Sequence, residues 1–138
     1  MERNTVTGKS ARRGFTLIEL MVVMSLIVIL ASIGLAIYST SVTRAKESVL
    51  KEDLFRMRDA IDQYYSDKGK YPGNLQDLVS DKYLRSIPVD PFTTSADTWR
   101  EVPSEPDPNN PSSQPGVYDV RSGSDATAID GTKYADWD

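Results

Sequence analysis

The sequence of 138 residues contains no cysteine and no histidine. Without cysteine, the chain can form no disulfide and offers no thiol nucleophile or thiolate metal ligand. Without histidine, it lacks the side chain that most often acts as general acid or base, and zinc sites built from Cys and His are excluded. A chain of this length allows one modest domain.

Basic residues are outnumbered by acidic residues outside the N-terminus. The whole chain has 16 basic and 20 acidic residues, whereas residues 1–14 alone carry a net charge of +3. The basic residues of this segment are Arg3, Lys9, Arg12 and Arg13, and its acidic residue is Glu2. Without these four basic residues and one acidic residue, the chain keeps 12 basic and 19 acidic residues, a net charge of −7. Nucleic-acid binding needs a basic surface, so this acidic remainder argues against a nucleic-acid partner.

One long apolar run, residues 15–38, follows the basic start, and Glu19 is its only charged residue. Its 24 residues are enough to cross about 30 Å of hydrocarbon as a helix. An ordinary secretory signal has a shorter apolar stretch followed by a small-residue cleavage site, and neither feature is present here. The basic residues before the run predict a cytoplasmic N-terminus and a head outside the cytoplasm.

Glu19 is unusual because a carboxylate costs about 2.5–3.5 kcal/mol at the centre of a membrane helix. The stretch from Arg12 to Leu20, which reads RRGFTLIEL, resembles the class III signal of type IV pilins and type II secretion pseudopilins. The resemblance implies that a prepilin peptidase cleaves between Gly14 and Phe15 and methylates the new N-terminus at Phe15. It also implies that Glu19 pairs with the N-terminal amine of a neighbouring subunit in a filament.

An apolar stripe extends the helical pattern beyond the membrane run. Its members recur at steps of four, three, four and three residues, and they are Leu50, Leu54, Met57, Ile61 and Tyr64. No proline or glycine interrupts residues 35–68, and Gly69 supplies a stop. We therefore expect one helix over residues 15–67, with an assembly part at 15–38 and a head at 39–138 that packs on the stripe.

The head itself carries signals for a short helix and a small sheet. Asn74 predicts the N-cap of a short helix with Leu75 and Leu78 facing inward. Residues 99–102 and 117–120 alternate like antiparallel strands. Five of the eight prolines lie in residues 103–115, which predicts an exposed loop. The predicted fold class is α+β, type IV pilin-like: a long N-terminal helix, a short helix and a small antiparallel β-sheet with a long Pro-rich loop.

Short sequence motifs in the head resemble those of one branch of this family. The runs at 68–72 (KGKYP), 83–84 (YL) and 87–92 (IPVDPF) resemble those of the major pseudopilin of type II secretion. The resemblance implies a three-stranded sheet and a subunit that polymerises with itself into a pseudopilus promoting protein export across the outer membrane. It implies an inner-membrane, single-pass protein with a periplasmic head. Its implied partners are the prepilin peptidase, minor pseudopilins and the inner-membrane assembly platform.

The C-terminal segment resembles the part of that family that binds calcium. The implied ligands are Asp125 as first carboxylate, Asp130 and Asp136 as candidates for the second, and the main-chain carbonyl of Ser122. Calcium takes 6–8 oxygen ligands from carboxylates and main-chain carbonyls in flexible loops. The same residue types also form the turns of a solvated acidic tail, so both interpretations remain open at this point.

Two other functions share some of these features. A type IV pilin, forming a surface filament for adhesion or motility, has the same N-terminal signal. Many such pilins carry two cysteines, so their absence here favours the pseudopilin. A membrane-anchored glycosidase would need two acids such as Asp119 and Asp125. A head of about 100 residues offers little room for a cleft, so we expect a structural subunit and no enzyme.

Overall fold

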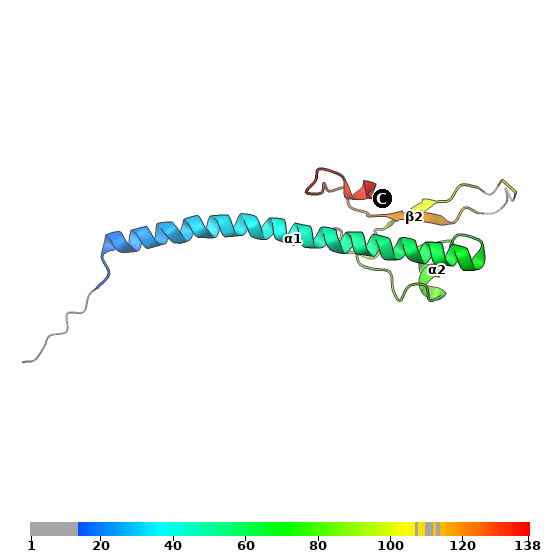
Figure 1. Cartoon of the computed structure of the whole chain (residues 1–138), viewed down its shortest axis with the longest axis horizontal. Coiled ribbons are helices and arrows are strands. Elements are labelled where there is room, and N and C mark those ends of the chain that lie inside the picture. The colour runs from blue at the N-terminus through cyan, green and yellow to red at the C-terminus, as the bar shows by residue number, and fades with distance from the viewer. Residues whose placement is uncertain (1–13, 107, 110–111, 113) are drawn as a thin grey trace, which may run out of the picture. The chain divides into compact units, whose positions relative to one another are not determined.

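The computed structural model describes residues 14–106, 108–109, 112 and 114–138. Its elements, in chain order, are α1 (Leu17–Lys68), α2 (Leu75–Ser80), β1 (Arg100–Pro103), β2 (Val117–Arg121) and the 3₁₀ helix η1 (Tyr134–Asp136) (Figure 1). The chain divides into two compact units, Met1–Ser39 and Thr40–Asp138. The predicted α+β class, with one long helix, a short helix and a small sheet, is confirmed. The predicted leader lies outside the described residues except for Gly14.

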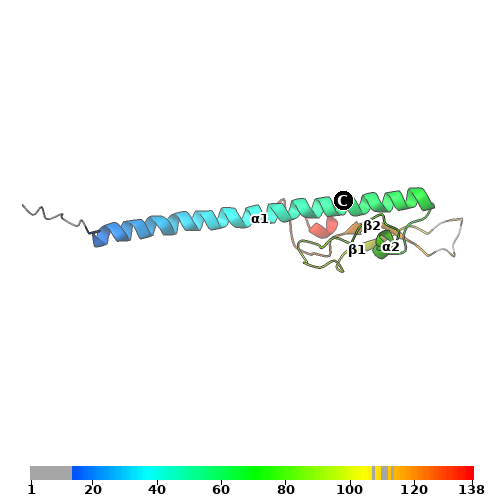
Figure 2. The same cartoon turned by 90° about the horizontal axis from the view of Figure 1, so that it is seen from below.

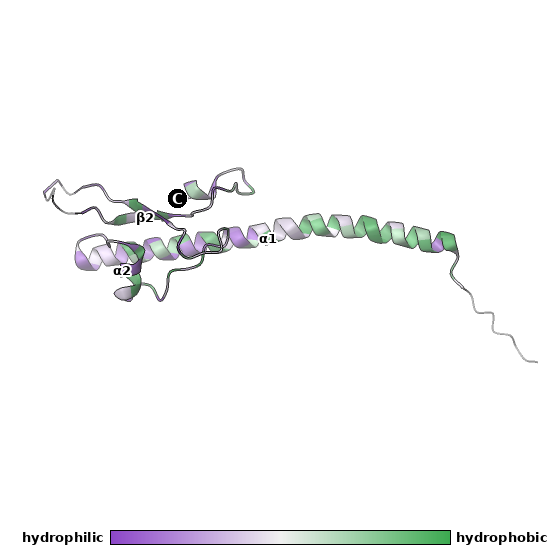
Figure 3. Cartoon of the chain, turned by 180° about the vertical axis from the view of Figure 1, so that it is seen from behind, coloured by the Kyte–Doolittle hydropathy of each residue, from purple (hydrophilic) through white to green (hydrophobic). Residues whose placement is uncertain are grey.

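The first unit holds the apolar part of α1. Figure 3 colours the ribbon of this stretch mostly green, the colour of hydrophobic residues. All its side chains are exposed within the chain, and by length and composition this helix could cross a membrane. Ser25 and Ser32 donate their hydroxyl protons to main-chain carbonyl oxygens one turn earlier. Such local bonds satisfy hydroxyl groups that would otherwise be unpaired in hydrocarbon.

The second unit is built on the remaining part of α1. The predicted stripe is confirmed, since all five of its residues are buried. The head adds apolar side chains to this cluster, and they are Leu75, Leu78, Trp99, Val117, Val120, Ala128 and Tyr134. Figure 2 shows α2, β1 and β2 on one side of this part of α1. Each fully buried large side chain contributes about 1.5–3 kcal/mol, so the stripe is the main support of the head.

A tight connection leads from α1 to α2. Gly69, at φ +68°, follows the last residue of α1 and donates its N–H to Tyr65 at 2.8 Å, as expected for a left-handed helix end. Asn74 caps α2 as predicted: its Oδ1 accepts the N–H of Asp77 at 3.0 Å. The carboxylate of Asp77 accepts the N–H of Asn74 in return, which completes a capping box.

Strands β1 and β2 pair antiparallel, with Glu101 opposite Val120. The predicted loop at 103–115 begins one residue too early, because Pro103 is the last residue of β1. Proline is tolerated there because the register shifts between Val102 and Pro103, and an irregular strand end needs no ladder N–H. The three-stranded sheet is also corrected: among the described residues the sheet has two strands. The C-terminal segment instead forms an isolated bridge between Thr127 and Lys133.

Candidate functional site

The predicted cleavage site lies in exposed backbone just before α1. Gly14 and Phe15 precede the helix and are both exposed, and Phe15 keeps 86% of its surface accessible. A Cβ atom added at Gly14 would meet no other atom within 4 Å. The peptide bond between them is therefore accessible, and the fold around it places no demand on the glycine.

Glu19 occupies the third position of α1, where it has a local role in addition to the predicted pairing. The main-chain carbonyl oxygen of Thr16 accepts the N–H of Leu20 at 3.1 Å. The side-chain Oγ1 of Thr16 accepts the N–H of Glu19 at 3.2 Å. Thr16 is therefore the N-cap of α1. A carboxylate in the first turn also stabilises the helix by about 0.3–1 kcal/mol through its interaction with the helix dipole. The Thr-x-x-Glu spacing is a capping-box pattern, a signal in the sequence that was missed.

Glu47 ties the C-terminal segment to α1. Its Oε1 accepts the N–H of Ile129 at 2.8 Å and the hydroxyl of Tyr134 at 3.0 Å. The Tyr134 ring is almost fully buried and stacks on Phe92 with ring centroids 3.9 Å apart. Burial, helped by the hydrogen bond to Glu47, raises the pKa of Tyr134 to about 12. Sequence reasoning missed this anchor.

Arg58 joins α1 to β2 and to the end of the chain. Its Nε donates to Oδ1 of Asp119 at 2.7 Å, and its Nη2 donates to the carbonyl oxygens of Val120 at 3.0 Å and Trp137 at 2.8 Å. The side chains of Arg58 and Asp119 are 24% and 19% exposed. Removing one partner of a pair so poorly solvated is costly, because the other charge is then left buried without compensation.

The predicted calcium ligands are dispersed over three local structures. Ser122 is fully buried, and its hydroxyl donates to the buried carboxylate of Asp90 at 2.5 Å. Asp125 accepts from Nη2 of Arg100 at 2.8 Å. Asp136 lies in η1 and is exposed. Ser122 and Asp125 thus share the turn after β2, whereas Asp136 lies in η1.

Asp130, the fourth predicted ligand, shapes the turn that it occupies. Its Oδ1 accepts the N–H of Thr132 at 2.9 Å and the Thr132 hydroxyl at 2.6 Å. The hydrogen bonds from Thr132 lower the pKa of the Asp130 carboxyl. Gly131 follows at φ +87°. Across the described part of the chain, no three acidic side chains gather closely enough to hold a metal ion. The calcium site therefore stays a prediction.

The two acids considered for glycosidase chemistry, Asp119 and Asp125, have different surroundings and different arginine partners. Asp119 lines a hollow of about 420 Å³ beside Arg58 and Arg121, and its carboxylate is held by Arg58. Asp125 does not line that hollow and is paired with Arg100. Nothing in this geometry presents the two carboxylates to one substrate.

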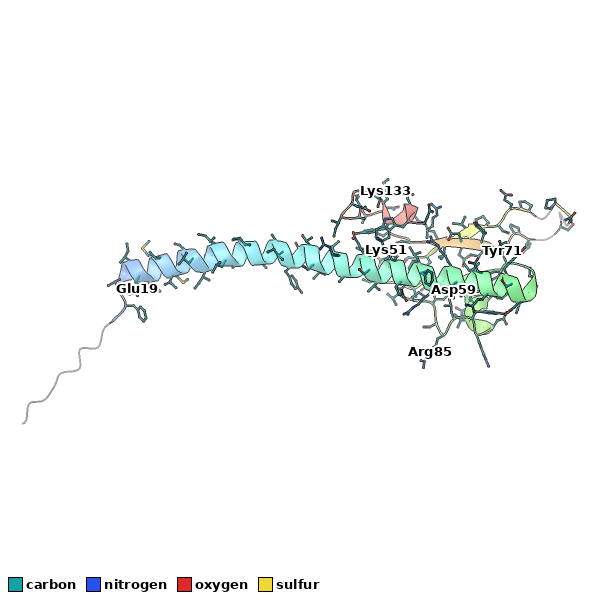
Figure 4. The ribbon with its side chains drawn as sticks, in the orientation of Figure 1. Glu19, Lys51, Asp59, Tyr71, Arg85 and Lys133 are labelled. Carbon is teal, nitrogen blue, oxygen red and sulfur yellow. The ribbon has the colours of Figure 1, made fainter. Side chains whose placement is uncertain are left out.

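A second hollow, of about 940 Å³, lies between α1 and the C-terminal segment 130–138. Phe55 and Trp137 contribute to its walls, and the ammonium of Lys51 lies 4.8 Å from the centre of the Trp137 ring. Figure 4 shows Lys51 and Lys133 on the same side of α1, with Arg85 on the other. The hollow is an open surface groove whose lining carries charges of both signs.

Comparison with known proteins agrees with the N-terminal geometry. The family described as "Prokaryotic N-terminal methylation motif" matches residues 9–35. The "Type II secretion system core protein G" of Pseudomonas aeruginosa is 34% identical over 95 residues, which cover 57% of this chain and 67% of that protein. The protein of the same name from Klebsiella michiganensis is 30% identical over 100 residues, 61% of this chain and 70% of the relative. This chain belongs to the family of type IV pilins and type II secretion pseudopilins.

Pilins are also among the relatives of this pilin-family chain. The "Fimbrial protein EcpC" of Eikenella corrodens is 38% identical over 86 residues, 59% of this chain and 56% of that protein. The chain spans about half the length of the fimbrial relatives that it matches. No solved structure matches it. The relatives carry the names of fimbrial proteins and of a type II secretion core protein, and the methylation motif covers the start of a helix that is long and apolar enough to cross a membrane.

Replacing Arg58 should test how strongly the head depends on its three contacts. Arg58→Met keeps the aliphatic stem but removes the ion pair with Asp119 and the donor to two carbonyl oxygens, so the head from Thr40 onward should lose about 2–3 kcal/mol of unfolding free energy. Arg56→Met is the matched control, because Arg56 forms an exposed pair with Glu52 within α1 worth at most about 0.5 kcal/mol. Denaturant unfolding measures both values, and equal losses would contradict the role of Arg58.

The raised pKa of Tyr134 predicts a loss of stability at alkaline pH. A phenol with a folded pKa of about 12 and an unfolded pKa near 10 contributes stability that is complete below pH 10 and is lost as the pH rises toward 12. Tyr134→Phe should cost about 1 kcal/mol at pH 7 and show a smaller further decline above pH 10. Unfolding curves between pH 7 and 11.5 decide this, and parallel declines in both proteins would refute it.

Proposed function

We propose that this chain is the major pseudopilin of a type II secretion system, a structural subunit that polymerises with itself into a pseudopilus and so promotes protein export across the outer membrane. The observation that carries the proposal is the accessible Gly14–Phe15 bond directly before an apolar helix with Glu19 in its first turn. The relatives named core protein G, of which the chain covers about two thirds, support the pseudopilin assignment.

The distribution of charge supports an inner-membrane location with a periplasmic head. Arg12 and Arg13 lie immediately before the apolar run, and basic residues are retained on the cytoplasmic side. The proposed partners are the prepilin peptidase that cleaves after Gly14, the minor pseudopilins and the inner-membrane assembly platform. In the filament the apolar helices of neighbouring copies would pack together.

Within that filament, Glu19 would pair with the N-terminal amine of Phe15 in a neighbouring copy. Cleavage creates this amine four residues before Glu19. Two opposite charges 4 Å apart gain about 4 kcal/mol at an effective dielectric constant of 20, which offsets the cost of about 2.5–3.5 kcal/mol for a carboxylate in hydrocarbon. A subunit out of register would leave both charges unpaired, so the pair would also set the axial register.

A type IV pilin is the second candidate function. The fimbrial protein of Eikenella corrodens, at 38% identity, favours it. Both candidates require the same processing and the same helix packing, so they differ in the location of the filament and not in how the subunit assembles.

Processing is directly testable. The mature protein should begin at Phe15 and carry one added methyl group. Intact-mass spectrometry of protein from cells with an active prepilin peptidase measures this. Gly14→Val should block cleavage without disturbing the fold, because no atom lies within 4 Å of the added Cβ. Full-length wild-type protein in those cells would contradict the processing site.

The charge of Glu19 can be separated from its local capping role. Glu19→Gln keeps a side chain suited to the third position of a capping box but removes the charge, whereas Glu19→Ala removes both. We expect both variants to insert and be cleaved, and both to lose nearly all filament yield. Thr16→Ala is the control for the cap and should assemble.

The cellular readout then distinguishes the two functions. For a pseudopilin, cells with Glu19→Gln should retain exported proteins in the periplasm. For a pilin, they should lose surface filaments while secretion continues. Normal filaments from Glu19→Gln would refute the charge pair under either function.

A further inference from the structure

The turn at residues 122–125 is held by hydrogen bonds between side chains and the main chain. The hydroxyl of Ser122 donates to Asp90 and accepts the N–H of Ser124 at 3.1 Å, and the hydroxyl of Ser124 accepts the N–H of Ala126 at 3.2 Å. Asp90 is fully buried, and its other oxygen accepts the N–H of Phe92 at 2.9 Å. This buried network sets the path of the turn, since each polar group in it has a partner.

Arg100, the first residue of β1, places a cation on this turn. Its Nη2 lies 2.8 Å from Oδ1 of Asp125 and 3.4 Å from the carbonyl oxygen of Gly123. A carboxylate and a main-chain carbonyl are the oxygen types that a calcium ion would take in such a loop. A single guanidinium therefore contacts both kinds of oxygen at once.

Gly123 explains why the arginine reaches the turn. A Cβ atom on Gly123 would lie 2.0 Å from the carbonyl oxygen of Thr98, so only glycine allows the turn to approach the chain just before β1. This close approach places Arg100 next to the turn. Asp130, one of the two candidates for a second carboxylate, accepts hydrogen bonds from Thr132 at another position.

We propose that the guanidinium of Arg100 is the resident cation of the 122–125 turn, in the position that the family resemblance gives to calcium, and that the head folds without a metal ion. An arginine remains charged at all physiological pH values, and it is part of the chain. Its effect therefore depends on neither the calcium concentration nor chelators. The head is thus suited to surroundings poor in calcium.

Thermal unfolding of the processed full chain in detergent micelles tests this. The wild-type midpoint should be the same in chelator and in millimolar calcium. Arg100→Gln should lower the midpoint by a few degrees, as expected for one partly exposed ion pair. Asp125→Asn should lower it by a similar amount, and the double variant should lose little more than either single variant, because both remove the same interaction.

A matched control separates this coupling from general loss of charge. Arg56→Gln breaks an exposed ion pair of the same kind, and its effect should add to that of Asp125→Asn. Two results would overturn the proposal. The first is a rise of several degrees in the wild-type midpoint with calcium, and the second is full additivity of Arg100→Gln and Asp125→Asn.

Discussion

One guanidinium group holds together the three parts of the head. Arg58 projects from α1 and donates to Asp119 in β2 and to the carbonyl oxygens of Val120 and Trp137. Apolar burial stabilises the head but is not directional, so the stripe on α1 does not by itself fix how the sheet and the C-terminal segment lie on it. A planar fork of donors does fix an orientation. The position of β2 and of the chain end on α1 therefore depends on Arg58.

The parts of the fold that could be predicted are those with local signals. The stripe from Leu50 to Tyr64 repeats with the helical period, and Asn74 marks a helix start within a few residues. Both signals act between neighbours in the sequence, where spacing determines contact. The Thr16-x-x-Glu19 cap is of the same kind and was equally accessible to sequence analysis.

The parts that could not be predicted are contacts between residues far apart in the sequence. Glu47 and Tyr134 are separated by 87 positions, and Arg100 and Asp125 by 25. No local pattern shows which cation will face a given carboxylate, because the tertiary fold decides it. The resemblance of the C-terminal segment implied a metal ion there, but it could not show that Asp125 faces Arg100 or that Asp130 accepts the donors of Thr132.

The carboxylates of the two units are compensated in different ways. In the head, the carboxylates of Glu47, Asp90 and Asp119 each accept hydrogen bonds from other parts of the same unit. In the apolar unit, Glu19 forms no ion pair among the described residues, although a charge in hydrocarbon needs a partner. A neighbouring copy would supply that partner under the proposed function. Under that function, the hydrogen-bonded carboxylates of the head act on folding, whereas the charge of Glu19 would act on assembly.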